Sequence, residues 1–125
     1  MTTVHANTPR DALTRLENMV GMAGLNLPSK ATRQQISSAI TAVIHVSRLT
    51  DGKRKITSIQ EITGMEGDIV TMQEIFIFEQ TGVDPDGMVR GNFRATGIRP
   101  KFIDRLRTRG VKISDDLFDP TRLYE

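Results

Sequence analysis

Apolar residues recur at helical spacing in the first third of the chain. Leu13 and Leu16 belong to one such pattern, which predicts a helix with one buried face. Thr8 is a typical N-cap residue and Pro9 is favoured at the first helical position, so we expect the helix to begin there. A second helix is predicted after Pro28, with an apolar face formed by Ile36, Ala39, Ile40 and Val43.

From residue 44 onward the period changes to the alternation of β-strands. The clearest strand pattern is segment 69–79, which reads IVTMQEIFIFE. Asp51-Gly52 is a hairpin turn signal, and segment 82–87 holds the Gly, Asp and Pro residues of another turn. Gly64 to Asp68 is predicted to be a loop. Three other segments predict strands: 44–49, 53–63 and 88–96.

The two ends of the chain differ in character. Residues 1–6 are uncharged and β-branched, which predicts a strand buried on both faces. A short helix is predicted from Pro100 to Gly110, and residues 111–125 are expected to be a loosely ordered tail. The predicted order is therefore one strand, two helices, about four mostly antiparallel strands and one C-terminal helix.

Composition narrows the class of protein. The 125 residues suffice for one domain, and 38% hydrophobic and 26% charged residues are ordinary values for a globular chain. The sequence has no cysteine, which excludes a disulfide framework, and no apolar run long enough to span a membrane. The net charge of +2 is too small to indicate nucleic-acid binding. We expect a cytoplasmic protein.

Two histidines are candidates for chemistry. His5 follows the predicted first strand and precedes a helix N-terminus, where an imidazole could contact a phosphate or position a water. The alternative is a structural histidine at a strand end. His45 lies between Ile44 and Val46 and is expected to be structural. No acidic partner stands at ligand spacing from either histidine, so no metal site is predicted.

Two acidic segments and one basic run are further candidate binding sites. The acidic residues of segments 64–68 and 84–87 suit turn chemistry and lack the donor pattern of a calcium loop. No G-x-x-x-x-G-K-[ST] phosphate loop is found in the sequence. A basic run near the C-terminus is either a solvated face or a surface for acidic lipid or RNA: Arg99, Lys101, Arg105, Arg107 and Arg109.

Segment 2–13, which reads TTVHANTPRDAL, resembles the histidine box of the type II/type IV secretion ATPases. Arg15-Leu16-Glu17 follows, as it often does in that box. Later segments resemble the Tad/Flp pilus assembly branch, the CpaF-like ATPases, and the resemblance extends to about Phe118. These segments are VSRL with DGKR (46–54), TGMEGD (63–68), FIFEQTG (76–82) and FRATGIRP (93–100).

The resemblance implies an α/β fold, the incomplete C-terminal half of a RecA-like P-loop NTPase. Residues 1–110 would be the part of the secretion ATPase domain that begins at the His box. The family forms hexamers at the cytoplasmic face of the inner membrane, where ATP turnover with Mg drives pilus assembly or secretion through platform proteins. His5 would be catalytic, near the γ-phosphate, with Thr3 and Asn7 beside it as nucleotide-binding residues.

The sequence departs from the family in one large respect. The phosphate loop, the acidic box and the magnesium-associated motif precede the His box in the family, and this sequence contains none of them. Phosphoryl transfer depends on those groups. We therefore expect neither ATP nor Mg to bind well and no hydrolysis by the chain alone. The alternative reading is an autonomous interaction module that binds motor subunits or an inner-membrane platform protein.

Overall fold

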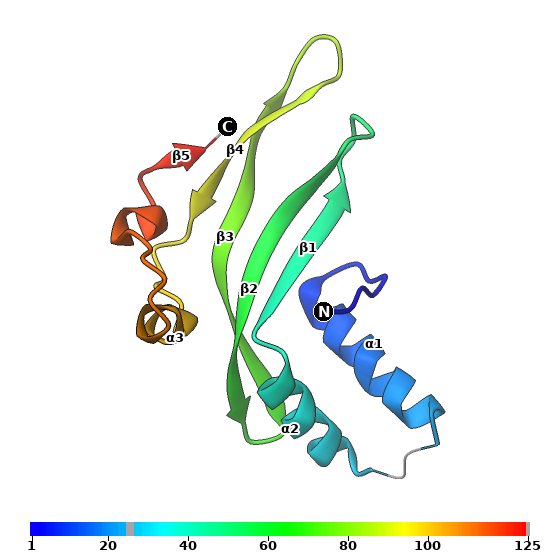
Figure 1. Cartoon of the computed structure of the whole chain (residues 1–125). Helices are drawn as coiled ribbons and strands as arrows, with labels where there is room; N and C mark the ends of the chain where they lie inside the picture. Colours follow the sequence, from blue (N-terminus) through cyan, green and yellow to red (C-terminus); the bar gives the residue numbers. More distant parts are fainter. Residues whose placement is uncertain (25–26, 125) are drawn as a thin grey trace.

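The computed structural model describes residues 1–24 and 27–124. Its centre is a five-stranded antiparallel sheet in which each strand pairs with the next one in the sequence (Figure 1). Long strands dominate this meander because β-branched and aromatic residues alternate with polar ones along them. The strands are β1 (Ala42–Arg48), β2 (Arg54–Glu66), β3 (Ile69–Val83), β4 (Val89–Ala95) and β5 (Leu123–Tyr124).

Helices flank the sheet on two sides. α1 (Pro9–Met22) and α2 (Ser29–Ala39) lie beside β1 and the adjoining part of β2 (Figure 1). α3 (Phe102–Thr108) and the 3-10 helix η1 (Asp115–Phe118) lie on the opposite side, near β3 and β4. Different helices thus cover the two faces of the sheet.

Each set of helices encloses its own apolar cluster. Burying one such aliphatic side chain stabilises the fold by about 1.5–3 kcal/mol. The cluster under α1 and α2 is formed by Leu13, Ile36, Ile62 and Val70. The cluster under α3 and η1 is formed by Ile75, Ala95, Ile103 and Phe118.

The start of α1 agrees with the capping signals. Thr8 is extended, and its Oγ1 accepts a hydrogen bond from the backbone N–H of Asp11 at 3.0 Å, with Pro9 in the first turn. Arg10 then donates from Nη2 to the carbonyl of Val70 at 2.8 Å, which fastens the helix to β3. The predicted helix start is confirmed.

Residues 1–6 do not form the predicted strand. The segment is irregular, and Thr2, Thr3 and His5 are exposed. A strand needs a hydrogen-bonded neighbour, and β-branched residues do not create one by themselves. This prediction was wrong because it inferred a sheet environment from local composition.

The predicted fold class was also wrong. The described strands are all antiparallel and follow sequence order, so the sheet is a meander in a mostly β arrangement. A RecA-like half would bring parallel strands and crossover helices into the sheet. The helices here instead precede and follow the strands, so the chain is not the α/β P-loop half that the resemblance implied.

Several boundaries also differ from the predictions. α2 ends at Ala39, so Val43, which was predicted to lie on its apolar face, belongs to β1. β2 continues through Gly64 to Glu66 although we expected a loop there, and the pairing with β3 shifts register between Ile62 and Gly64. β3 likewise extends to Val83. The segment 111–124, expected to be loosely ordered, carries η1 and β5, while Glu125 lies outside the described residues.

Candidate functional site

The His-box residues gather around an open polar hollow at the start of α1. The hollow measures about 480 Å³ and is lined by His5, Ala6, Asn7, Asp11 and Arg15. The side chains of His5, Asn7 and Arg15 are exposed, so they reach solvent and any partner that approaches this end of the helix. The fold therefore brings two of the three predicted site residues together.

Arg15 fixes the main chain of this segment. Its Nη1 donates a hydrogen bond to the carbonyl oxygen of His5 at 3.1 Å. One turn of helix separates Arg15 from Asp11, so both side chains face the same hollow. Thr3, the third predicted residue, is exposed and is not among the lining residues. Arg15 was quoted in the sequence motif but was not predicted to support His5.

The residues at this hollow do not fit a nucleotide triphosphate with magnesium. A free helix N-terminus attracts phosphate, but here Thr8 already occupies the N–H of Asp11. The carboxylate of Asp11 also faces the hollow and would repel a phosphate. Within residues 1–24 and 27–124, no cluster of three His, Cys, Asp or Glu residues could hold a metal ion. Among the lining side chains, His5, Asn7 and Arg15 can each donate a hydrogen bond to an anion, but Asp11 on the same hollow offsets the charge of Arg15.

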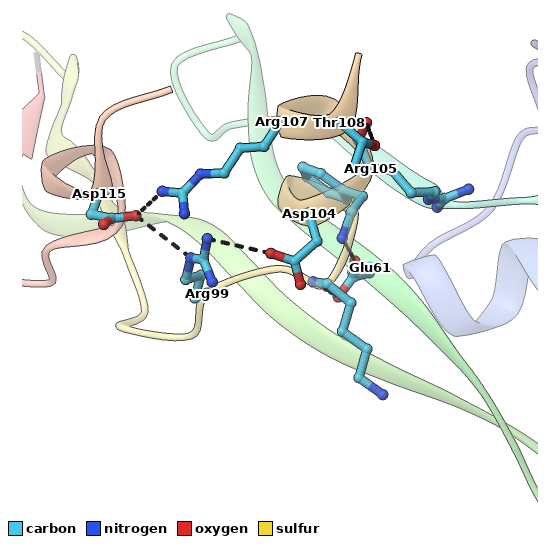
Figure 2. Close-up of polar contacts among 9 residues, drawn as sticks. Glu61, Arg99, Asp104, Arg105, Arg107, Thr108 and Asp115 are labelled. Atoms are coloured by element: carbon cyan, nitrogen blue, oxygen red, sulfur yellow. Dashed lines mark hydrogen bonds and ion pairs between the residues drawn. The ribbon is translucent and has the colours of Figure 1, made fainter. Parts of the chain in front are cut away.

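A second polar centre surrounds the start of α3, and the sequence did not reveal it. Glu61 of β2 is only 2% exposed. Its carboxylate, drawn in Figure 2, accepts from the backbone N–H groups of Lys101 and Phe102, each at 2.9 Å. It also accepts from Nε2 of Gln73 at 2.9 Å. Polar and apolar residues mix along β2, so no local pattern set Glu61 apart in the sequence. The arrangement is that of a structural clamp on α3.

The predicted basic run is partly neutralised within the chain. Arg99 pairs with Asp104 at 3.6 Å and with Asp115 at 3.5 Å, and Arg107 pairs with Asp115 at 2.9 Å (Figure 2). These groups are exposed, so the pairs contribute little to stability. Ion pairs within the chain therefore engage Arg99 and Arg107 of this run, whereas Lys101, Arg105 and Arg109 form none among the described residues.

The remaining candidates are accounted for by local structure. His45 lies in β1, half-buried, and its carbonyl accepts a hydrogen bond from Thr57 Oγ1 at 3.4 Å. Asp84 pairs with Arg90 across the β3–β4 turn, as turn chemistry predicts. In the part of the chain that the structure describes, the helices are too short or too polar to cross a bilayer.

Similarity to known proteins is confined to part of the chain. No family model matches it. The chain is 31% identical over 67 residues to a protein named "Putative conjugal transfer protein" in Mycobacterium tuberculosis, in strains CDC 1551 / Oshkosh and ATCC 25618 / H37Rv. The match covers 54% of this chain and 18% of each relative. The chain thus spans less than a fifth of the relatives that it matches.

Proposed function

We propose that this chain is the C-terminal portion of a secretion or pilus-assembly motor protein of the CpaF-like type. The observation that carries the proposal is the 31% identity over 67 residues to proteins whose name assigns them to conjugal transfer, a transport process. The order of the motifs from the His box onward supports the same reading. In this proposal the motor is a hexamer at the cytoplasmic face of the inner membrane.

The chain's own contribution is structural and positional. The apolar cluster under α1 and α2 includes Leu13 and so anchors the end of the His-box segment on the sheet. His5 would supply one polar group to a phosphate site whose other groups come from a different part of the motor. Because the hollow does not fit a nucleotide, we expect no ATP turnover by the purified chain.

A chimera tests the proposal. The region of the mycobacterial relative that corresponds to the whole chain, and that includes the 67 matched residues, is replaced by residues 1–125. We expect the relative to turn over ATP, and its turnover is compared with that of the chimera and of the chimera with His5→Ala. We expect the chimera to retain the parent's turnover and His5→Ala to reduce it by about a hundredfold or more, the effect of removing a positioned catalytic group.

The control is His45→Ala in the same chimera, because His45 lies in β1 away from the hollow. Equal loss in both variants would point to general damage. A folded chimera whose turnover is unchanged by His5→Ala would rule out the proposed role of His5. Turnover by the isolated chain would contradict the claim that it is only a portion of the motor.

A further inference from the structure

One face of β1 and β2 carries apolar side chains that lie open to solvent. Ile44 and Val46 of β1 are 59% and 53% exposed, and Val46 lies opposite Ile56 of β2, which is 43% exposed. Val43, the neighbour of Ile44, packs toward the cluster under α1 and α2. Because side chains alternate along a strand, Ile44 and Val46 point to the opposite face. In residues 1–24 and 27–124, no helix covers them.

This face continues into an apolar hollow of about 610 Å³ over β2 and β3. Exposed apolar areas of this kind usually mark interaction sites. η1 and β5 form the far wall, so the hollow is a groove that opens toward the edge strand β1. Its apolar lining includes Ile56, Ile59, Phe76, Phe93, Leu117 and Tyr124.

Positive charge gathers at one end of the same groove. Arg48 of β1 lies directly opposite Arg54 of β2, and Arg54 and Lys55 line the hollow. Like charges at directly opposed positions destabilise a sheet. Among the described residues, none of these three cations forms an ion pair within 4.0 Å. Carboxylates from outside the chain would relieve this repulsion.

We propose that the groove binds an amphipathic helix of a partner polypeptide, apolar along one side and acidic at one end. The patch extends across β1, β2 and β3, about 10 Å, which is the diameter of a helix and wider than one acyl chain. The same strands already accept helices, α1 and α2, on their other face. The acidic end of the partner would lie over Arg48 and Arg54. This inference does not rest on ATP turnover.

The experiment uses two labelled synthetic peptides of about four helical turns, each with a Leu stripe at helical spacing. One carries a Glu cluster at its end and the other carries Lys there. Fluorescence anisotropy measures binding to the full chain. We expect the Glu peptide to bind about tenfold more tightly than the Lys peptide, the effect of two or three surface ion pairs.

Variants locate the binding. Arg48→Glu combined with Arg54→Glu should reverse the preference between the peptides, and Ile56→Ser should weaken both. The matched controls are Arg109→Glu and Ile69→Ser, which alter an exposed charge and an exposed aliphatic residue outside the groove. These controls should leave binding unchanged.

Four results would overturn the proposal. Equal binding of both peptides would remove the role of the cations, and no binding of either would remove the site. Binding to vesicles of phosphatidylglycerol and phosphatidylcholine in place of the Glu peptide would indicate a lipid surface. Sedimentation as a dimer that Ile44→Ser dissociates would show that a second copy of the chain covers the face.

Discussion

Replacing Glu61 tests whether one buried carboxylate holds α3 on the sheet. Glu61→Ala removes the acceptor for the backbone N–H groups of Lys101 and Phe102 and for the Gln73 amide. A hydrogen bond to a charged group contributes about 1.5–3 kcal/mol, and the donors left behind lose their partners. Since the three bonds share one carboxylate and are not additive, we expect a loss of about 3–5 kcal/mol.

A loss of about 3–5 kcal/mol would be a large share of the free energy of unfolding of the whole chain. Domains of this size unfold with a free energy of about 5–15 kcal/mol. A change of 1 kcal/mol lowers the melting temperature by roughly 3–6 °C at this chain length. We therefore expect Glu61→Ala to melt about 9–30 °C below the wild type, combining the two ranges.

Glu61→Gln keeps the size of the side chain but removes its negative charge, so it shows how much of the stabilisation depends on the charge. The amide keeps one oxygen but presents an NH₂ group where the carboxylate accepted a hydrogen bond, so two donors would face each other. We expect an intermediate loss of about 2–3 kcal/mol. Thermal unfolding followed by circular dichroism measures the loss of stability. Amide exchange at Phe102 reports whether α3 detaches before the sheet unfolds.

The control is Glu66→Gln, which changes an exposed carboxylate at the end of the same strand. It should alter the melting temperature by no more than about 2 °C, as surface substitutions usually do. If Glu61→Ala is no more destabilising than Glu66→Gln, the clamp has no energetic role and the reasoning from hydrogen bonds to α3 is refuted.

Two further predictions concern the hairpins. Asp51, in the β1–β2 turn, accepts a hydrogen bond from the backbone N–H of Val89 at the start of β4, at 3.0 Å, and so links the β1–β2 hairpin to the β3–β4 hairpin. This hydrogen bond, followed by the one from the backbone N–H of Lys53, lowers the pKa of Asp51 below 3.8. The ionised carboxylate of Asp51 therefore stabilises the fold above pH 3.8, and this stabilisation is lost as the pH falls through the pKa of Asp51 in the folded state. The melting temperature of the wild type should exceed that of Asp51→Asn by less as the pH is lowered. A difference that stays constant with pH would contradict this role of Asp51. A Cβ at Gly91 would collide with the carbonyl of Glu79 and come within 2.6 Å of Phe78 Cζ, so Gly91→Ala should cost about 1–3 kcal/mol in denaturant unfolding. Gly21→Ala, in α1 with open space around it, should instead stabilise by about 0.5–1 kcal/mol, and similar effects at both positions would refute the steric argument.

Elements with strong local signals were predicted well from the sequence. Thr8 and Pro9 specify a helix start through contacts within a few residues, so no knowledge of the tertiary fold was needed. The alternation in segment 69–79 likewise marks a half-buried strand directly. The Asp51-Gly52 turn is found at the tip of the β1–β2 hairpin, where Gly52 has a φ of +83°.

Features that depend on distant partners were not predicted. The β-branched residues at 2–4 gave a strand pattern, yet strand formation depends on a neighbour that local sequence does not specify. Segment 64–68 was predicted to be a loop, but Gly64 lies at a register shift with a φ of +141°, where glycine lets the strand continue. The resemblance to secretion ATPases concerned motifs, and motifs do not determine sheet order.

The candidate site was predicted only in part, because some of its contacts are local in the sequence and others join distant residues. His5 and Asn7 are close in sequence, so their shared hollow follows from local geometry. Glu61 and the amides that it accepts from are 40 and 41 positions apart, and no short motif links them. The groove beside Arg48 and Arg54 also required the strand register, since the opposed arginines are six positions apart in the chain.

The sequential order of the sheet has a consequence for how the chain folds. β1 to β4 pair in sequence order through short turns, so the contacts between them are local and should form quickly, one hairpin after another. β5 joins β4 only after α3 and η1. The contact from Arg10 to Val70 spans 60 positions and requires a finished β3. The His-box segment should therefore reach its final position late in folding, after the meander that supports it has formed.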